Sequence, residues 1–162
     1  MRPIEGEPPA PVHIRRATAA DLAGWIALRD GLAEDDPEAL ARARRLVGDP
    51  ARVAFVAEVD GASVGVLDAV LHRHWGRCPR RGPAAVIEGL YVAPRWRYLG
   101  IATALRDALA AWARGEGARC LFSDVDLANQ EAQAWHRAVG FDEVERVVAF
   151  CQPLEPGVPA CH

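Results

Sequence analysis

Apolar residues recur every three or four positions over residues 22–31 and again over 37–48, and this spacing predicts two amphipathic helices. Thr18 and Asp21 precede the first helix with the spacing of a capping box. Pro37 follows two aspartates and has the place that proline favours in a first helical turn. We therefore expect two consecutive helices in the first third of the chain.

Strands are expected where apolar residues alternate with polar ones or follow each other without a break. Residues 53–59 and 63–71 predict a hairpin, because Asp60-Gly61 between them is a typical two-residue turn. Residues 84–92 form an apolar segment that only a glutamate and a glycine interrupt. The other expected elements are strands over 13–17, 119–125 and 141–150 and helices over 101–115 and 129–139.

The order of these elements predicts the fold class. Strands alternate with helices in the second half of the chain, which is typical of α/β (or α+β) proteins with a mixed sheet and helices on its faces. A chain of 162 residues fits a single domain with one core. We expect that domain over residues 12–154, between a Pro-rich leader over 1–11 and a loose tail over 155–162.

Composition and charge narrow the range of functions. A net charge of −3 without a basic tail argues against a nucleic-acid partner. No run approaches the ~20 apolar residues of a membrane span, and residues 1–11 lack an apolar signal core. Because the cysteines lack CxxC spacing, we expect no zinc site, no disulfide framework and a cytoplasmic protein; they are Cys78, Cys120, Cys151 and Cys161.

The segment over residues 88–103 leaves an apolar strand, passes a turn and enters a helix. A helix entry of this kind offers unpaired backbone N–H groups to phosphate oxygens, and Arg97 adds a positive charge. Gly100 and Ala102 keep the entry shallow. On spacing alone, an ordinary strand-turn-helix whose small residues only ease packing explains the segment equally well.

The spacing Arg97-x-x-Gly100-x-Ala102 resembles the acetyl-CoA signature of the GNAT acetyltransferases, Q/R-x-x-G-x-G/A, and Gly140-Phe141 follows as it does in that superfamily. The resemblance implies the GNAT fold, with a central splayed sheet flanked by helices. It also implies acetyl-CoA as cosubstrate and no metal. The implied cofactor contacts are Leu90, Tyr91, Val92, Arg97, Tyr98, Leu99, Gly100, Ile101, Ala102, Thr103 and Asn129.

A narrower resemblance extends over most of the chain. Ile-Glu-Gly-Leu-Tyr-Val-Ala-Pro (87–94), Phe-Ser-Asp-Val-Asp-Leu-Ala-Asn (122–129) and Glu-Val-Glu-Arg-Val-Val-Ala-Phe (143–150) are similar to the aminoglycoside 6'-N-acetyltransferases. The resemblance implies acetylation of the 6'-amine of these antibiotics, hence resistance, and a homodimer. Two alternatives stay open: acetylation of another small amine, a polyamine or a protein N-terminus, and an acyl-CoA-binding domain without catalysis.

The resemblance assigns three acidic residues to the substrate. Glu88 would contact the acceptor ammonium and help to remove its proton, while Asp124 and Glu145 would contact the cationic drug. Each has a plainer explanation. Glu88 could stand at a sheet edge or pair with an arginine, Asp124 could lie at a solvated strand end together with Asp126, and Glu145 could be a surface charge.

Two further residues complete the expected site. Trp75 stands where the family has an aromatic substrate contact, and a tryptophan in such a loop is either a stacking wall or a core anchor. His136 stands where many GNAT enzymes have a tyrosine that protonates the departing thiolate, and a histidine could donate that proton. It could equally be a helix histidine with satisfied hydrogen bonds.

Three features depart from the family pattern. Ala33 replaces a tryptophan that is usual in the early helical loop, and Ala128 replaces an aspartate. The loop over residues 72–82 carries four arginines, which is more positive charge than a site for a polycation favours. These features concern the acceptor side of the expected site and leave the acetyl-CoA side untouched.

Overall fold

The computed structural model describes residues 11–30, 37–77 and 81–154 of the chain. These residues divide into two compact units, with the boundary between Asp126 and Leu127. In the described ranges no helix is long and apolar enough to cross a membrane.

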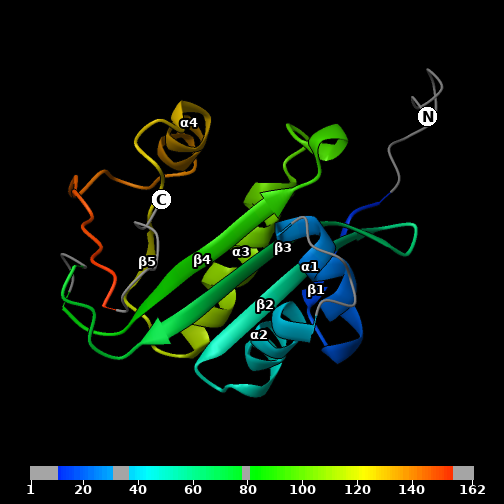
Figure 1. Ribbon diagram of the computed structural model, residues 1–162. Helices are drawn as coiled ribbons and strands as arrows, with labels where there is room; N and C mark the ends of the chain where they lie inside the picture. Colours follow the sequence, from blue (N-terminus) through cyan, green and yellow to red (C-terminus); the bar gives the residue numbers. More distant parts are fainter. Residues whose placement is uncertain (1–10, 31–36, 78–80, 155–162) are drawn as a thin grey trace. The chain divides into compact units, whose positions relative to one another are not determined.

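The first unit is built on a five-stranded mixed sheet (Figure 1). Its strands follow the chain in the order β1 (His13–Arg16), β2 (Arg52–Val59), β3 (Ala62–His72), β4 (Ala84–Val92) and β5 (Cys120–Ser123). The first four are antiparallel neighbours, and β5 is parallel to β4. The mixed sheet expected from the sequence is therefore confirmed.

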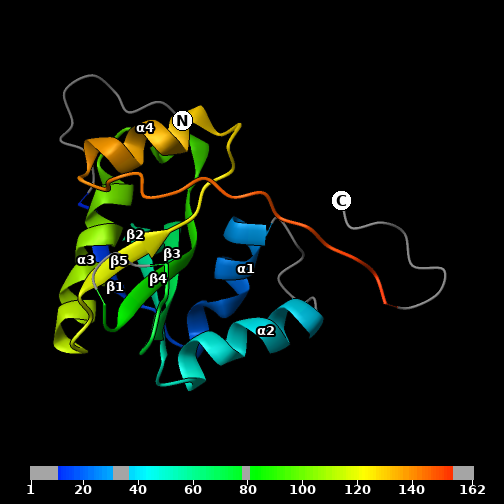
Figure 2. The ribbon, with the colours of Figure 1, turned by 90° about the vertical axis from the view of Figure 1, so that its left-hand side faces the viewer.

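Helices cover both faces of this sheet (Figure 2). On one face lie α1 (Leu22–Asp30) and α2 (Pro37–Gly48), and on the other lies α3 (Ile101–Gly115). The apolar sides predicted by helical spacing are buried, because they face the sheet: Trp25 and Ile26 pack with Val56 and Val66. Burial of these side chains is the main contribution to holding the layers together.

Most expected boundaries agree with the structure. Asp60 and Gly61 both have positive φ, 50° and 78°, as a type I′ hairpin turn requires. β4 and α3 have the predicted ends, and Pro37 is the first residue of α2.

The second unit contains α4 (Gln130–Ala138) and an extended segment. The strand predicted over 141–150 is wrong, because residues 141–154 form neither helix nor strand. Alternation of apolar residues describes a strand's faces, but a strand also needs a neighbour for its backbone hydrogen bonds. The segment exposes large apolar side chains, including Val148 at 77% and Phe150 at 94%.

The cysteines also differ from expectation. Cys120 and Cys151 each take part in a disulfide, whereas the sequence predicted no disulfide framework. The spacing of cysteines along the chain does not reveal which of them the tertiary structure brings within bonding distance.

An ion-pair cluster fixes the chain between β1 and α1. The Asp21 carboxylate accepts hydrogen bonds from the Thr18 backbone N–H at 2.7 Å and from both terminal nitrogens of Arg15 at 2.8 Å. Arg15 also donates to Glu58 at 2.7 Å. The hydrogen bonds from Arg15 hold the pKa of Asp21 well below its usual value.

We predict that Asp21→Asn lowers the free energy of unfolding by about 1 kcal/mol at pH 7, since it removes the negative charge from the bidentate ion pair with Arg15 and leaves a neutral acceptor for the Thr18 N–H. Because the folded-state pKa is depressed, the wild-type advantage is fully present above the unfolded-state pKa, begins to fall below it, and is lost as the pH falls through the folded-state pKa. Urea unfolding of both proteins between pH 7 and pH 3 measures this. A difference that stays constant over that range would contradict the prediction.

Candidate functional site

β4 and β5 part halfway along β4. Their registered pairs run from Ala84 opposite Cys120 to Ile87 opposite Ser123, and β4 then continues to Val92 while β5 ends. In the described part of the chain, no strand pairs with residues 88–92 on that side. This is the splay that the GNAT resemblance implied, and it leaves backbone groups available to an extended ligand.

The loop after β4 has the geometry of an anion cradle. Tyr98 and Gly100 have positive φ, 63° and 80°, and α3 begins at the next residue. A methyl group built on Gly100 would meet nothing within 4 Å, so the glycine serves the left-handed backbone rather than close packing. The first-turn N–H groups of α3 lack partners within the helix and can receive phosphate oxygens.

Arg97 is anchored beside this cradle. Its Nε donates to the Val92 carbonyl at 3.0 Å, and its guanidinium lies 5.7 Å from the centre of the Tyr91 ring. These contacts tie the charge to the end of β4 and leave the terminal nitrogens as further donors. The cradle, the charge and the open side of β4 fit the pyrophosphate and pantetheine parts of acetyl-CoA.

A β-bulge places Glu88 at the point where the strands part. Opposite β3, Asp68 pairs with Gly89 and Ala69 pairs with Ile87, so Glu88 is the extra residue. Because of this insertion, the alternation of side chains between the two faces of β4 shifts by one residue at Glu88.

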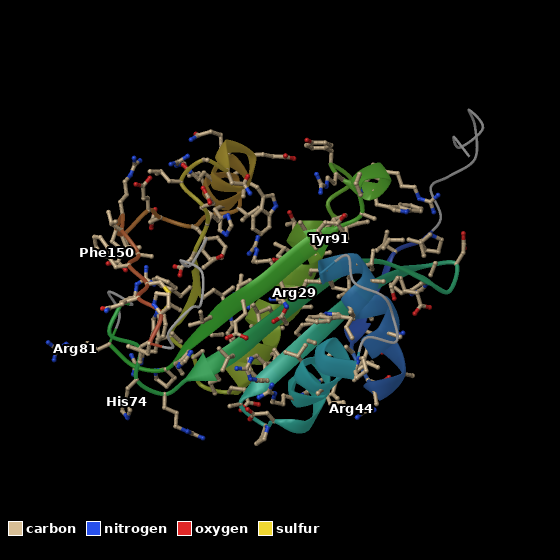
Figure 3. The ribbon with its side chains drawn as sticks, viewed as in Figure 1. Arg29, Arg44, His74, Arg81, Tyr91 and Phe150 are labelled. Atoms are coloured by element: carbon tan, nitrogen blue, oxygen red, sulfur yellow. The ribbon has the colours of Figure 1, made fainter. Side chains whose placement is uncertain are left out.

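The pairing of β3 with β4 shows this shift in the alternation of side chains. Val86 lies opposite Val70 and Tyr91 lies opposite Val66. Val66 and Val70 share a face of β3, so Val86 and Tyr91 share a face of β4 although they are five positions apart, and an odd spacing in a regular strand would place them on opposite faces. The bulge thus sends Tyr91 to the face that α1 covers, where it packs against the core (Figure 3).

Glu88 forms an ion pair with an arginine, which the sequence analysis had left open. Arg52 Nη1 lies 2.5 Å from Glu88 Oε2, and Arg52 Nε lies 3.6 Å from Asp49 Oδ2. The pair is not buried, because 37% of the Glu88 side chain is exposed. A cationic substrate that binds Glu88 therefore meets a carboxylate that already has a positive neighbour.

The sequence analysis missed a second ion pair at the bulge. Asp68 on β3 is 1% exposed, and Arg29 Nε from α1 lies 3.4 Å from its Oδ1. Figure 3 shows Arg29 over the centre of the sheet. One available signal was a lone aspartate in the apolar run over 63–71, since a buried carboxylate requires a partner.

Trp75 follows β3 and packs against β5, and Asp124 directly follows β5. The Trp75 ring packs 5.5 Å from Phe122 and 4.4 Å from His72, as a core anchor does. Asp124 is exposed and accepts a hydrogen bond at 3.2 Å from Arg77, whose guanidinium also lies over Phe122. Contact of either residue with a substrate stays a prediction.

The structure brings Glu88 and Asp124 to the same level of the sheet. Each directly follows the last registered pair of β4 and β5, Ile87 and Ser123. Arg52 and Arg77 stand beside these two carboxylates, so part of the positive charge in the basic loop compensates Asp124. Ala33, which stands where the family usually has a tryptophan, lies outside the described residues.

The remaining site residues belong to the second unit. The Asn129 side chain caps α4 by accepting from the Ala132 N–H at 3.0 Å. His136 Nδ1 lies 2.7 Å from the Ala132 carbonyl, which only accepts, so Nδ1 carries the proton. Glu145 is exposed in the extended segment. Their roles toward acetyl-CoA and substrate stay predictions.

Comparisons with known proteins agree with this geometry. The acetyltransferase (GNAT) family model matches residues 19–141. An aminoglycoside N(6')-acetyltransferase type 1 of Stenotrophomonas maltophilia is 40% identical over 144 residues, which cover 88% of this chain and 94% of the relative.

Solved structures give the same result. AAC(6')-Iy in complex with the bisubstrate analogue CoA-S-monomethyl-acetylneamine has a TM-score of 0.80 at 29% identity, over 89% of this chain and 99% of that one. The aminoglycoside antibiotic 6'-N-acetyltransferase AAC(6')-Ih from Acinetobacter baumannii has a TM-score of 0.79 at 31% identity, over 90% and 100%. The GNAT fold expected from the cofactor loop is thereby confirmed. The chain belongs to the acetyltransferase (GNAT) family and, within it, to the aminoglycoside N(6')-acetyltransferases.

Proposed function

We propose that this protein transfers the acetyl group of acetyl-CoA to the 6'-amine of aminoglycosides and so confers resistance to them. The observation that carries the proposal is the parting of β4 from β5 at Glu88, directly before the cradle that ends at Gly100. This arrangement sets Glu88 at the start of the open edge of β4, which suits an extended thioester. The similarity to a structure solved with a CoA-linked aminoglycoside analogue supports the same pairing of ligands.

The chain's own residues would hold acetyl-CoA by backbone contacts. The α3 first turn, Ile101 to Thr103, and the Arg97 terminal nitrogens would bind the pyrophosphate, and Leu90 to Val92 would bind the pantetheine arm. Tyr98 and Leu99 line the outer side of the loop, where both are exposed. The cosubstrate supplies an activated acetyl thioester, so the reaction calls for no metal.

Glu88 would act on the acceptor amine. The substrate arrives as an ammonium ion, and Glu88 takes one proton from it, directly or through a water molecule. The neutral amine then attacks the thioester carbonyl: a C–N bond forms, the C–S bond breaks, and the backbone N–H groups near Tyr91 and Val92 stabilise the carbonyl oxygen. The nitrogen of the tetrahedral adduct gives its second proton to a water molecule, and the sulfur leaves as a thiolate.

His136 would return a proton to that thiolate. Its Nδ1 proton is engaged by the Ala132 carbonyl, so Nε2 is the atom that can exchange protons with the sulfur. Donation from Nε2 requires the doubly protonated imidazolium. Asn129 would contact the pantetheine through its amide nitrogen, because its oxygen serves the α4 cap.

Acidic side chains would recognise the drug. Asp124 and Glu145 add carboxylates to Glu88, and Trp75 offers the partly exposed part of its ring to a sugar. Arg52 and Arg77 stand next to two of these acids, which lowers the negative charge available to a polycation. This observation favours, as a second candidate, a smaller amine with fewer charges as the acceptor.

We also propose a homodimer and a cytoplasmic location. The dimer accounts for the extended segment over 144–154, whose exposed Val147, Val148 and Phe150 are the side chains that an interface between copies buries. A strand-like segment with an apolar side can pair with a second chain. Cell fractionation tests the location.

The first prediction concerns Glu88. In Glu88→Gln, kcat/KM for tobramycin falls by about 100-fold, because the variant cannot accept a proton. Thiol release from acetyl-CoA measures the rate, and Glu116→Gln, an exposed glutamate after α3, is the matched control. Unchanged activity in Glu88→Gln would remove this residue from the mechanism without affecting the family assignment.

The second prediction concerns the cofactor loop. Arg97→Gln raises KM for acetyl-CoA by about 10-fold and leaves KM for the aminoglycoside unchanged, since it removes charged hydrogen-bond donors near the cradle. Steady-state kinetics with each substrate varied in turn measures both constants. Arg95→Gln, two residues away and stacked on Trp96, should match the wild type. An equal rise in both variants would refute a specific role for Arg97.

The third prediction concerns the oligomer. Replacement of Val148 and Phe150 by glutamate gives a monomer, because charges at an apolar interface cost free energy on association. Light scattering after size exclusion measures the mass of each form. Wild-type protein that elutes as a monomer, or a variant that stays dimeric, would contradict the proposed interface.

A further inference from the structure

The bulge at Glu88 needs something to keep it in place. An extra residue interrupts the β3–β4 ladder, and a shift of the insertion by one position would turn Glu88 to the opposite face. The hydrogen bonds of the flanking pairs alone do not distinguish these registers. A contact specific to this position is therefore expected.

Asp68 provides one half of that contact. It lies directly opposite Gly89, the residue after the bulge, and it is the buried charged side chain of the described core. A buried carboxylate is strongly destabilising unless a cation and hydrogen bonds compensate it. The register that places Asp68 beside Arg29, with Nε 3.4 Å from Oδ1, is accordingly favoured.

Arg29 provides the other half and reaches both strands. Besides its contact with Asp68 on β3, its Nη2 donates to the Glu88 carbonyl on β4 at 3.3 Å. Its guanidinium also lies 5.1 Å from the centre of the Trp25 ring in α1. One planar side chain thus connects the helix, the buried acid and the backbone of the bulged residue.

The Arg29–Asp68 ion pair fills the space that a side chain at position 89 would need. A Cβ built there would overlap Arg29 Nε and would lie 2.5 Å from Asp68 Oδ1. Positive φ is not the reason for this glycine, since its φ is not in the left-handed region. The residue next to the bulge is therefore small because the Arg29–Asp68 pair occupies the place of a side chain.

We propose that Arg29 and Asp68 are positioning residues for Glu88, which hold the bulge in register and so aim the carboxylate at the acceptor amine. The inference rests on the proton-accepting role proposed for Glu88. Neither residue touches the reacting atoms. Their effect must pass through Glu88, which distinguishes them from residues that only stabilise the fold.

A double-mutant cycle tests the proposal. Arg29→Gln is made in the wild type and in Glu88→Gln, and kcat is measured by thiol release at saturating acetyl-CoA and tobramycin. We expect Arg29→Gln to lower kcat by about 10-fold in the wild type and to cause almost no further loss when Glu88 is already replaced. KM for acetyl-CoA should change less than about two-fold, because the cradle is not involved.

Controls separate positioning from folding. Arg44→Gln, an exposed arginine of α2 that Figure 3 labels, should leave kcat unchanged. Circular dichroism checks that each variant is folded. Where Arg29→Gln fails to fold, Gly89→Ala replaces it in the cycle, since it displaces the same ion pair without removing a charge. Arg29→Lys, which keeps the charge and loses the planar fork, should recover only part of the rate.

The outcomes are distinct. The same loss of kcat in both backgrounds, or no loss in the wild type, would overturn the positioning role and leave the role of Glu88 intact. Full activity of Glu88→Gln alone would refute the role of Glu88, and the inference would fall with it. A coupled loss supports both.

Discussion

The end of the β4–β5 ladder at Ile87 and Ser123 is the constraint on which the rest of the site depends. Up to that pair the two strands are held by backbone hydrogen bonds and cannot accept a ligand between them. Beyond it, β4 keeps its contacts with β3 on one side only, so its other side can bind an extended molecule. The bulge at Glu88 falls at this same point, and the Glu88 carboxylate reaches across the face of the sheet to Arg52 on β2.

Two ion pairs lie around the bulge, and they differ in how far their carboxylates are buried. The Asp68 side chain is only 2% exposed, so Arg29 of α1 compensates a carboxylate that water hardly reaches, and this favours a fixed geometry. The Glu88 side chain is 37% exposed, so water screens its pair with Arg52 and the pair contributes less to stability. The first pair suits positioning and the second suits binding and release.

The acceptor side carries less negative charge than its acids alone suggest. Arg77 compensates Asp124, and Arg52 compensates Glu88, so any cation that binds these carboxylates has to replace an arginine rather than meet a bare acidic surface. The same pairs explain why a loop rich in arginine lies at a site proposed for cations. Arg77 of that loop compensates Asp124, whereas Arg52 of β2 compensates Glu88.

The sequence by itself determined the elements from β1 to α4 and the cradle at Gly100, because helical spacing, turn residues and small residues at a helix entry act locally. It did not determine that residues 141–150 would form no strand. It also did not determine that Cys120 and Cys151 would form disulfides, or that Arg52 and Arg29 would contact Glu88. Strand partners, disulfides and ion pairs join residues far apart in the chain. The packing of α1 on the sheet and the pairing of β2 with β3 bring Arg29 and Arg52 to Glu88, and no local pattern encodes either of them.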